Sequence, residues 1–211
     1  MTTLPVQMID RWASRSEPGP GQGTVYWHML MNDHPQVVSL ATKAQQRLAP
    51  FTGLHMTPLE RLHMTTMIAG PSHDFSDDQL HRMIEAAGDL LSRTPPIAVT
   101  LGQILYHPEA IMLAVTPAQA LMPVRDAVQA ATQLVTGKNP STDTPRWTPH
   151  VTISYSTSAK PAGPIIAALG PQLPSCEIQV SAVSLVIQHG PERLWDWHTI
   201  GTVHLPAPAR T

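Results

Sequence analysis

Cysteine is nearly absent from this chain of 211 residues, since Cys176 is the only one. A single cysteine cannot form an internal disulfide, which is typical of proteins from a reducing compartment. The sequence also lacks any run of about 20 apolar residues, the length that a helix needs to span a membrane. The first 23 residues are polar and lack the apolar core of a signal peptide. We therefore predict a soluble, cytoplasmic protein with no membrane contact.

An excess of charge of one sign is missing as well. Lysine and arginine together number 13, aspartate and glutamate 15, and the formal net charge is -2. A protein that binds duplex DNA usually carries a broad positive surface. The balance argues against duplex DNA as a partner, but it is compatible with a small nucleotide or an RNA end held by a few local contacts. The length suits one domain, or two small lobes that share a core, and we expect a monomer.

Turn residues and hydrophobic periodicity divide the chain into alternating strands and helices. Residues 16–23 are rich in glycine and proline, so we predict a flexible arm over residues 1–23, a single domain over 24–205 and a tail over 206–211. Strands are expected where β-branched and aromatic residues cluster, and helices where apolar residues recur every three or four positions. The predicted strands are 24–31, 62–69, 97–106, 110–115, 147–155, 177–188 and 194–205, and the predicted helices are 34–49, 77–94, 117–136 and 161–169.

This order contains the same unit twice: a helix, a strand with a histidine, a helix and a pair of strands. Antiparallel strand pairs with helices on one side are typical of an α+β fold. We predict two lobes related by a pseudo-twofold axis. Each lobe would have an antiparallel sheet with helices on its outer face, and a central cleft would lie between the lobes.

Two of the predicted strands carry a histidine and a threonine two residues apart. The pairs are His63-Met-Thr65 and His150-Val-Thr152. Side chains two apart in a strand share a face, so each histidine would point the same way as its threonine. The predicted sets are His63, Thr65 and Met67 on one strand and His150, Thr152 and Ser154 on the other, with Ile68 and Tyr155 facing away.

The bare pattern is weak evidence, because a chain with 11 histidines should contain roughly two such matches by chance. A third match, His55-Met-Thr57, precedes Pro58, which interrupts a strand, and we predict that His55 lies in a loop or at a lobe edge. The other two matches lie in apolar strands, each followed by a helix and a strand pair. Their context is therefore what favours a function.

Cleavage of a phosphodiester without a metal needs a base for the attacking oxygen and an acid for the leaving oxygen. Histidine can serve as either near neutral pH. The two groups must lie on opposite sides of the phosphorus, so they should come from two separate elements. A threonine hydroxyl on the same face can donate a hydrogen bond to a non-bridging phosphate oxygen. The two pairs thus have the composition of a phosphodiesterase site.

The sequence resembles the 2H phosphoesterases, which include the LigT-like RNA 2′,3′-cyclic phosphodiesterases known as 2′-5′ RNA ligases. Residues 58–65 and 147–155 are similar to the family's two motif segments, with histidines at positions 63 and 150. The actinobacterial branch is the most similar. The resemblance implies a bilobal fold, catalytic His63 and His150, and phosphate contacts from Thr65 and Thr152, with no metal and no cofactor. Substrates would be 2′,3′-cyclic phosphates, 2′-5′ linkages or related small nucleotide phosphodiesters.

The chain departs from the family at Tyr155. Members that process RNA usually place an arginine three residues after the second threonine. The resemblance therefore supports the family's reaction for this chain more strongly than it supports the family's RNA substrate. We lean to His150 as base and His63 as acid in hydrolysis. One alternative is a binding module that holds a nucleotide or RNA end without cleaving it. A histidine-rich metal hydrolase is less compatible with the sequence, because no aspartate or glutamate lies within a few residues of His150, and we assign no metal site.

Overall fold

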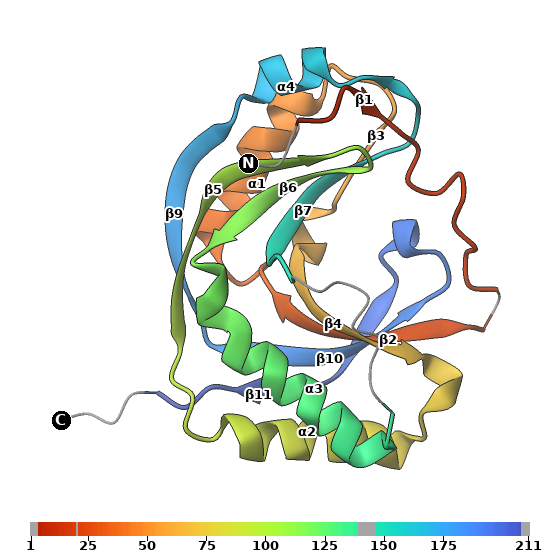
Figure 1. Cartoon of the computed structure of the whole chain (residues 1–211), viewed down its shortest axis with the longest axis vertical. Helices are drawn as coiled ribbons and strands as arrows, with labels where there is room; N and C mark the ends of the chain where they lie inside the picture. The colour runs from red at the N-terminus through yellow and green to blue at the C-terminus, as the bar shows by residue number, and fades with distance from the viewer. Residues whose placement is uncertain (1–3, 20, 139–146, 208–211) are drawn as a thin grey trace.

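Two antiparallel sheets organise the molecule, and helices cover the outer face of each (Figure 1). The computed structural model describes residues 4–19, 21–138 and 147–207. The strands are β1 (Gln7–Met8), β2 (Gly23–Leu30), β3 (Leu54–Met56), β4 (His63–Pro71), β5 (Ile97–His107), β6 (Ala110–Thr116), β7 (His150–Ser156), β8 (Lys160–Pro161), β9 (Gln172–Val180), β10 (Ala182–His189) and β11 (Trp197–His204). One sheet has the order β11-β10-β2-β4 and the other β3-β7-β6-β5-β9, while β1 and β8 form a separate pair.

The helices lie in pairs on the two outer faces. Helices α1 (Pro35–Leu48) and α4 (Gly163–Leu169) contact each other, and α1 packs on the five-stranded sheet. Helices α2 (Asp77–Leu91) and α3 (Met122–Thr136) contact each other and the four-stranded sheet. The predicted α+β fold of two lobes is confirmed. We call the helix-free face of each sheet its inner face.

Each sheet is assembled from distant parts of the chain. Strand β4 pairs with β2, and β2 pairs in turn with β10, whereas β7 lies between β6 and β3. The buried apolar side chains of both sheets form one continuous cluster. Trp27 illustrates the packing, since it is fully buried and its Nε1 donates to Thr132 Oγ1 of α3 over 3.1 Å. The two lobes therefore share a core, and neither is a contiguous stretch of sequence.

A β-bulge follows the threonine of the first His-Thr strand. In the pairing of β2 with β4, His28 lies opposite Thr65, but the preceding residue, Trp27, lies opposite Met67. Thr66 is therefore an extra residue on β4. An extra residue interrupts the alternation of side chains, so residues beyond it change faces.

The second His-Thr strand has a bulge at the equivalent place. Thr152 lies opposite Met112, whereas Ser154 lies opposite the neighbouring Ile111, so Ile153 is the extra residue. Bulges are common beside active sites, where they redirect a side chain. The two strands thus share a structural irregularity as well as a sequence pattern.

The bulges correct the predicted alternation beyond each threonine. Tyr155 reaches the inner face and joins the aromatic cluster there, while Ser154 lies opposite Ile111 of the core. On the first strand, Met67 belongs to the core and Ile68 lies opposite Tyr26. The prediction assumed an uninterrupted period of two, and it is wrong for these four residues.

Residues 4–19 of the predicted arm pack against the rest of the protein. Strand β1 pairs with β8, and Met8 is fully buried in the shared core. The backbone N–H groups of Ile9 and Arg11 donate to the carbonyls of Pro108 and Ser156. In Figure 1 the segment runs from β1, near the five-stranded sheet, along one side of the molecule toward β2. These contacts do not fit the flexible arm predicted over residues 1–23. That prediction was based on the glycine- and proline-rich composition of residues 16–23.

Some boundaries also differ from the prediction. The predicted strand 177–188 is two strands, β9 and β10, that belong to different sheets. Helix α3 starts at Met122, after a short 3₁₀ helix (Ala118–Leu121). Residues 139–146, between the predicted helix 117–136 and the predicted strand 147–155, and residues 208–211 of the predicted tail lie outside the described residues. Within the described ranges, no helix is both long and apolar enough to cross a membrane.

Candidate active site

The two predicted histidines begin equivalent strands and are held in the same way. His63 is the first residue of β4, and its Nδ1 lies 2.8 Å from the carbonyl oxygen of Arg61. His150 is the first residue of β7, and its Nδ1 lies 2.8 Å from the carbonyl oxygen of Thr148. A carbonyl oxygen can only accept, so each neutral ring carries its proton on Nδ1 and keeps a lone pair on Nε2. This arrangement makes Nε2 of each ring the atom suited to proton transfer.

The structure brings these histidines together from opposite sheets. The indole Nε1 of Trp147 connects the two motif segments by donating to the carbonyl of Thr65 over 3.1 Å. Burial lowers the pKa of His63, and the charge of His150 lowers it further. The pKa of His150 is also lowered, chiefly by burial. Each imidazole therefore favours its neutral form more than a free histidine does.

The charged neighbours of the two histidines differ. Beyond burial, the positive charge of Arg11 lowers the pKa of His150. At His63, the negative charge of Glu192 acts against burial and favours the protonated ring. Arg11 thus disfavours protonation of His150, whereas Glu192 favours protonation of His63.

Both predicted threonines lie on the inner faces with their histidines. Thr152 is 7% exposed and Thr65 is half-buried. The Thr152 side chain lies close enough to Tyr155 to lower the pKa of its hydroxyl, against the effect of burial. Burial raises the pKa of Tyr155 to about 12, so its hydroxyl stays protonated and can donate at neutral pH. Sequence reasoning set Tyr155 on the other face, and only the bulge at Ile153 reveals it as a neighbour of the site.

His28 is a second residue of the site that sequence reasoning did not assign. It is 2% exposed, and its ring centroid lies 4.2 Å from that of His63. Its Nδ1 has no hydrogen-bond partner among the described residues. Burial places the pKa of His28 well below its usual value, and the charge of His63 lowers it further. His28 is thus a neutral ring packed against His63.

We expect His28→Phe to reduce the loss of stability in acid. An unfolded histidine gains a proton as pH falls below about 6.5, whereas folded His28 resists protonation. Stability is therefore fully present above pH 6.5 and lost as pH falls below it, by up to about 1.4 kcal/mol per pH unit for each such group. Urea unfolding at pH 7.5, 6.5 and 5.5 measures the slope, which should be shallower in the variant. His81→Phe, at an exposed position of α2, is the control, and equal slopes in all three proteins would contradict the expectation.

The third His-Thr match is not brought to the other two. His55, predicted in a loop or at a lobe edge, lies on β3, a strand at the edge of its sheet, and its Nε2 is 3.1 Å from Trp195 Nε1 and 3.0 Å from the carbonyl oxygen of Arg193. The rings of Trp12 and Trp195 lie 5.5 and 6.2 Å from its own. Among the described residues, no group of three or more His, Cys, Asp or Glu side chains is arranged to hold a metal ion.

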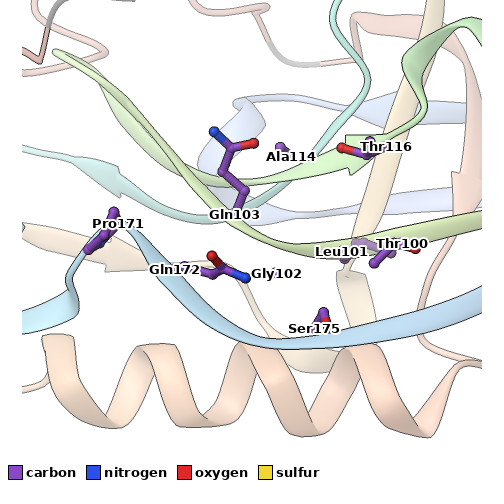
Figure 2. Close-up of a pocket in the computed structure, with 9 residues that line it drawn as sticks. All are labelled: Thr100, Leu101, Gly102, Gln103, Ala114, Thr116, Pro171, Gln172 and Ser175. Atoms are coloured by element: carbon purple, nitrogen blue, oxygen red, sulfur yellow. The ribbon is translucent and has the colours of Figure 1, made fainter.

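An open hollow of about 480 Å³ lies on the five-stranded sheet, between β5, β6 and β9 (Figure 2). Ala114, one of its lining residues, is the strand partner of His150. Most of the side chains around it are polar and uncharged. The lining residues are Thr100, Leu101, Gly102, Gln103, Ala114, Thr116, Pro171, Gln172 and Ser175. The hollow therefore offers hydrogen-bonding groups one strand away from His150.

The two-sheet architecture is that of the LigT-like proteins. TT0787 of Thermus thermophilus superposes with a TM-score of 0.65 and 15% identity, over 87% of this chain and 98% of that one. E. coli LigT in complex with 3′-AMP gives 0.64 and 15%, over 90% and 99%. The PDE domain of MHV ns2 gives 0.58 and 12%, over 79% and 99%. At these identities the likeness establishes the fold.

The profile of the 2′-5′ RNA ligase superfamily matches residues 35–192. The chain belongs to this superfamily, the LigT-like 2H phosphoesterases, which confirms the resemblance seen in the sequence. A comparison with curated proteins gives no match. The affinity to an actinobacterial branch stays a prediction.

Proposed function

We propose that the protein is a phosphodiesterase that hydrolyses a small nucleotide phosphodiester with His63 and His150, without a metal or other cofactor. The observation that carries the proposal is the matched pair of imidazoles. Each begins a strand on opposing sheets, and each donates from Nδ1 to a carbonyl two residues earlier. The charge of one histidine also affects the pKa of the other. Superfamily membership supports the same chemistry.

In the proposed reaction, Nε2 of His150 takes a proton from water as the water oxygen attacks the phosphorus. The bond from phosphorus to the leaving ribose oxygen breaks, and His63, which enters the step as an imidazolium protonated on both nitrogens, delivers its Nε2 proton to that oxygen and keeps the proton on Nδ1. The hydroxyls of Thr65 and Thr152 donate to the non-bridging oxygens, where negative charge develops. For a 2′,3′-cyclic phosphate the product is a nucleoside monophosphate. In ring closure the same two histidines exchange roles.

A small nucleotide as substrate is supported by the complexes of a structural relative. E. coli LigT has been crystallised with 3′-AMP, ATP, NADP+ and phosphate. The hollow on the five-stranded sheet offers uncharged polar groups of the kind that hydrogen-bond to a base or a sugar. We further propose a cytoplasmic monomer. The half-buried free thiol of Cys176 supports the compartment.

A product screen tests the function. Purified protein would be incubated with 2′,3′-cyclic nucleotides, 2′-5′ dinucleotides, cyclic dinucleotides and ADP-ribose cyclic phosphate, each with and without EDTA. We expect turnover of at least one substrate, undiminished by EDTA, and none by His63→Asn/His150→Asn protein. Loss of activity in EDTA, restored by a metal, would overturn the metal-independent mechanism. Tight calorimetric binding of a nucleotide with no product from any substrate would instead identify a binding module.

A further inference from the structure

The N-terminal segment ties the two sheets together through Arg11. Its guanidinium makes two hydrogen bonds of 2.9 Å to the carboxylate of Glu192, which lies between β10 and β11 of the four-stranded sheet. The same group contacts Glu109, in the turn between β5 and β6 of the five-stranded sheet, over 3.3 Å. Arg15 also pairs with Glu109, and Glu17 pairs with Arg193. Three side chains of one segment thus span both lobes.

An aromatic cluster fills the space beneath this segment. The guanidinium of Arg11 lies 4.2 Å from the ring centroid of Tyr155, and the Trp12 ring lies 5.6 Å from it. Trp195 continues the series, 5.8 Å from Tyr155 and 6.1 Å from His63. Tyr155 and Trp195 are 6% and 5% exposed. Packed rings therefore occupy the path from the N-terminal segment to His63.

The register of β6 shows on which side of His150 these packed aromatic rings lie. Ala110 is opposite Tyr155, and Ala114, further along β6, is opposite His150. Thr116 comes next and lines the hollow. The site therefore has a closed end at Tyr155 and an open end at the hollow, with the paired histidines between them.

We propose that residues 6–17 form a cap, anchored by Arg11, that restricts the site to phosphodiesters with a nucleoside on the hollow side only. A 2′,3′-cyclic mononucleotide meets this condition, since its leaving oxygen stays on the same ribose. A 2′-5′ dinucleotide does not, because its second nucleoside would have to occupy the space that Tyr155, Trp12 and Trp195 fill. The inference rests on the proposed function and narrows its substrate class to cyclic phosphate ends.

The lining of the open end agrees with a nucleoside. Gln103, Thr116 and Thr100 offer amide and hydroxyl groups to a base and a sugar. A site for the additional phosphates of a longer RNA would instead require lysine or arginine, and neither residue type lines the hollow. The uncharged lining favours one nucleoside unit over a longer RNA.

The test compares kcat/KM for 2′,3′-cyclic AMP with that for a 2′-5′-linked adenosine dinucleotide. Wild type should prefer the cyclic substrate. Arg11→Ala, which leaves Glu192 and Glu109 without their shared partner, should improve the dinucleotide relative to the cyclic substrate by at least about tenfold, or 1.4 kcal/mol. Because Arg11 also acts on His150, Trp12→Ala is the second variant, and it should shift the ratio the same way while keeping that charge. Arg82→Ala, which removes an exposed ion pair with Asp78 on α2, should leave the ratio unchanged.

Two results would overturn the cap: wild-type protein that cleaves both substrates equally well, or an unchanged ratio in both cap variants, each shown to be folded by circular dichroism. If wild type turns over neither substrate, the wider product screen decides separately whether the proposed function fails. The cap is then judged on binding, by calorimetry with 3′-AMP and the same dinucleotide. A preference for 3′-AMP that both cap variants weaken would support it, and equal affinities in all proteins would reject it.

Discussion

His63→Asn is expected to lower kcat on a cleavable cyclic nucleotide by about 10²–10⁴-fold, the usual contribution of a general acid or base. Asparagine is the informative replacement because of how the ring is held. Its amide N–H can keep the bond that Nδ1 makes to the carbonyl of Arg61, now 2.8 Å. Nothing in asparagine replaces Nε2. A loss of rate in a folded variant therefore reports proton transfer and not the position of the strand.

His150→Asn should show a loss of the same order, for the same reason at Thr148. The pH dependence separates the two roles. Wild-type kcat/KM should be bell-shaped, because the base must be neutral and the acid protonated. Since the pKa values of both histidines are lowered from 6.5, both limbs should have midpoints below that pH. With His150 as base, His150→Asn removes the acid limb; with His63 as acid, His63→Asn removes the alkaline limb.

The matched control is His81→Asn. His81 makes the same kind of bond, from Nδ1 to the carbonyl of Asp77 over 2.7 Å, but on the exposed surface of α2. Its replacement should leave kcat and the pH profile as in wild type. Full activity in either folded variant, His63→Asn or His150→Asn, would rule out the two-histidine mechanism.

Thr65→Val and Thr152→Val should each lower kcat by about 10²–10³-fold, as expected when one donor to a developing negative charge is removed. Valine keeps the β-branched shape that suits a strand, so packing changes little. Because the donor acts most strongly in the transition state, kcat should fall more than KM rises. Steady-state kinetics on the best substrate of the screen measures both parameters.

Thr66 provides a control within the same strand. It is the extra residue of the bulge, 2% exposed, and its hydroxyl has no hydrogen-bond partner among the described residues. Thr66→Val should leave kcat unchanged and raise stability by about 1 kcal/mol, since an unsatisfied buried hydroxyl is lost. Equal losses of rate at positions 65 and 66 would show that the strand, and not the donor, matters.

Local patterns were sufficient to predict most of the helices and the two His-Thr strands. Ser76 and Gln79, three residues apart, have the sequence pattern of a capping box at the start of α2, and both of its reciprocal hydrogen bonds are present. His63 and His150 were predicted from the strand context of their His-Thr pairs and from the family resemblance, and the strands that they begin, β4 and β7, contact each other from different sheets. Their catalytic role stays a prediction that the variants above would test.

The structural features that the sequence analysis did not predict depend on contacts between residues that are distant in sequence. A bulge is a mismatch between two paired strands, so Ile153 cannot be identified as an extra residue without knowing that β6 lies beside β7. The contact of Arg11 with Glu192 joins residues 181 positions apart. The apolar side chains Met8 and Trp12, within an otherwise linker-like stretch, were the one local signal that this segment packs on the domain. His28 gave no signal at all, because its role comes from the neighbouring strand.

The interleaving of the sheets has a consequence for the way the protein acquires its site. Strand β4, with His63 and Thr65, is flanked only by β2, and β2 gains its second neighbour from β10, more than 150 residues later in the chain. Pairings between such distant segments form slowly, and their unpaired edges are exposed to aggregation until they close. During synthesis, the four-stranded sheet therefore stays incomplete, with β2 unpaired on one side, until β10 has been made. Catalytic competence and completion of the fold should arise in the same late step.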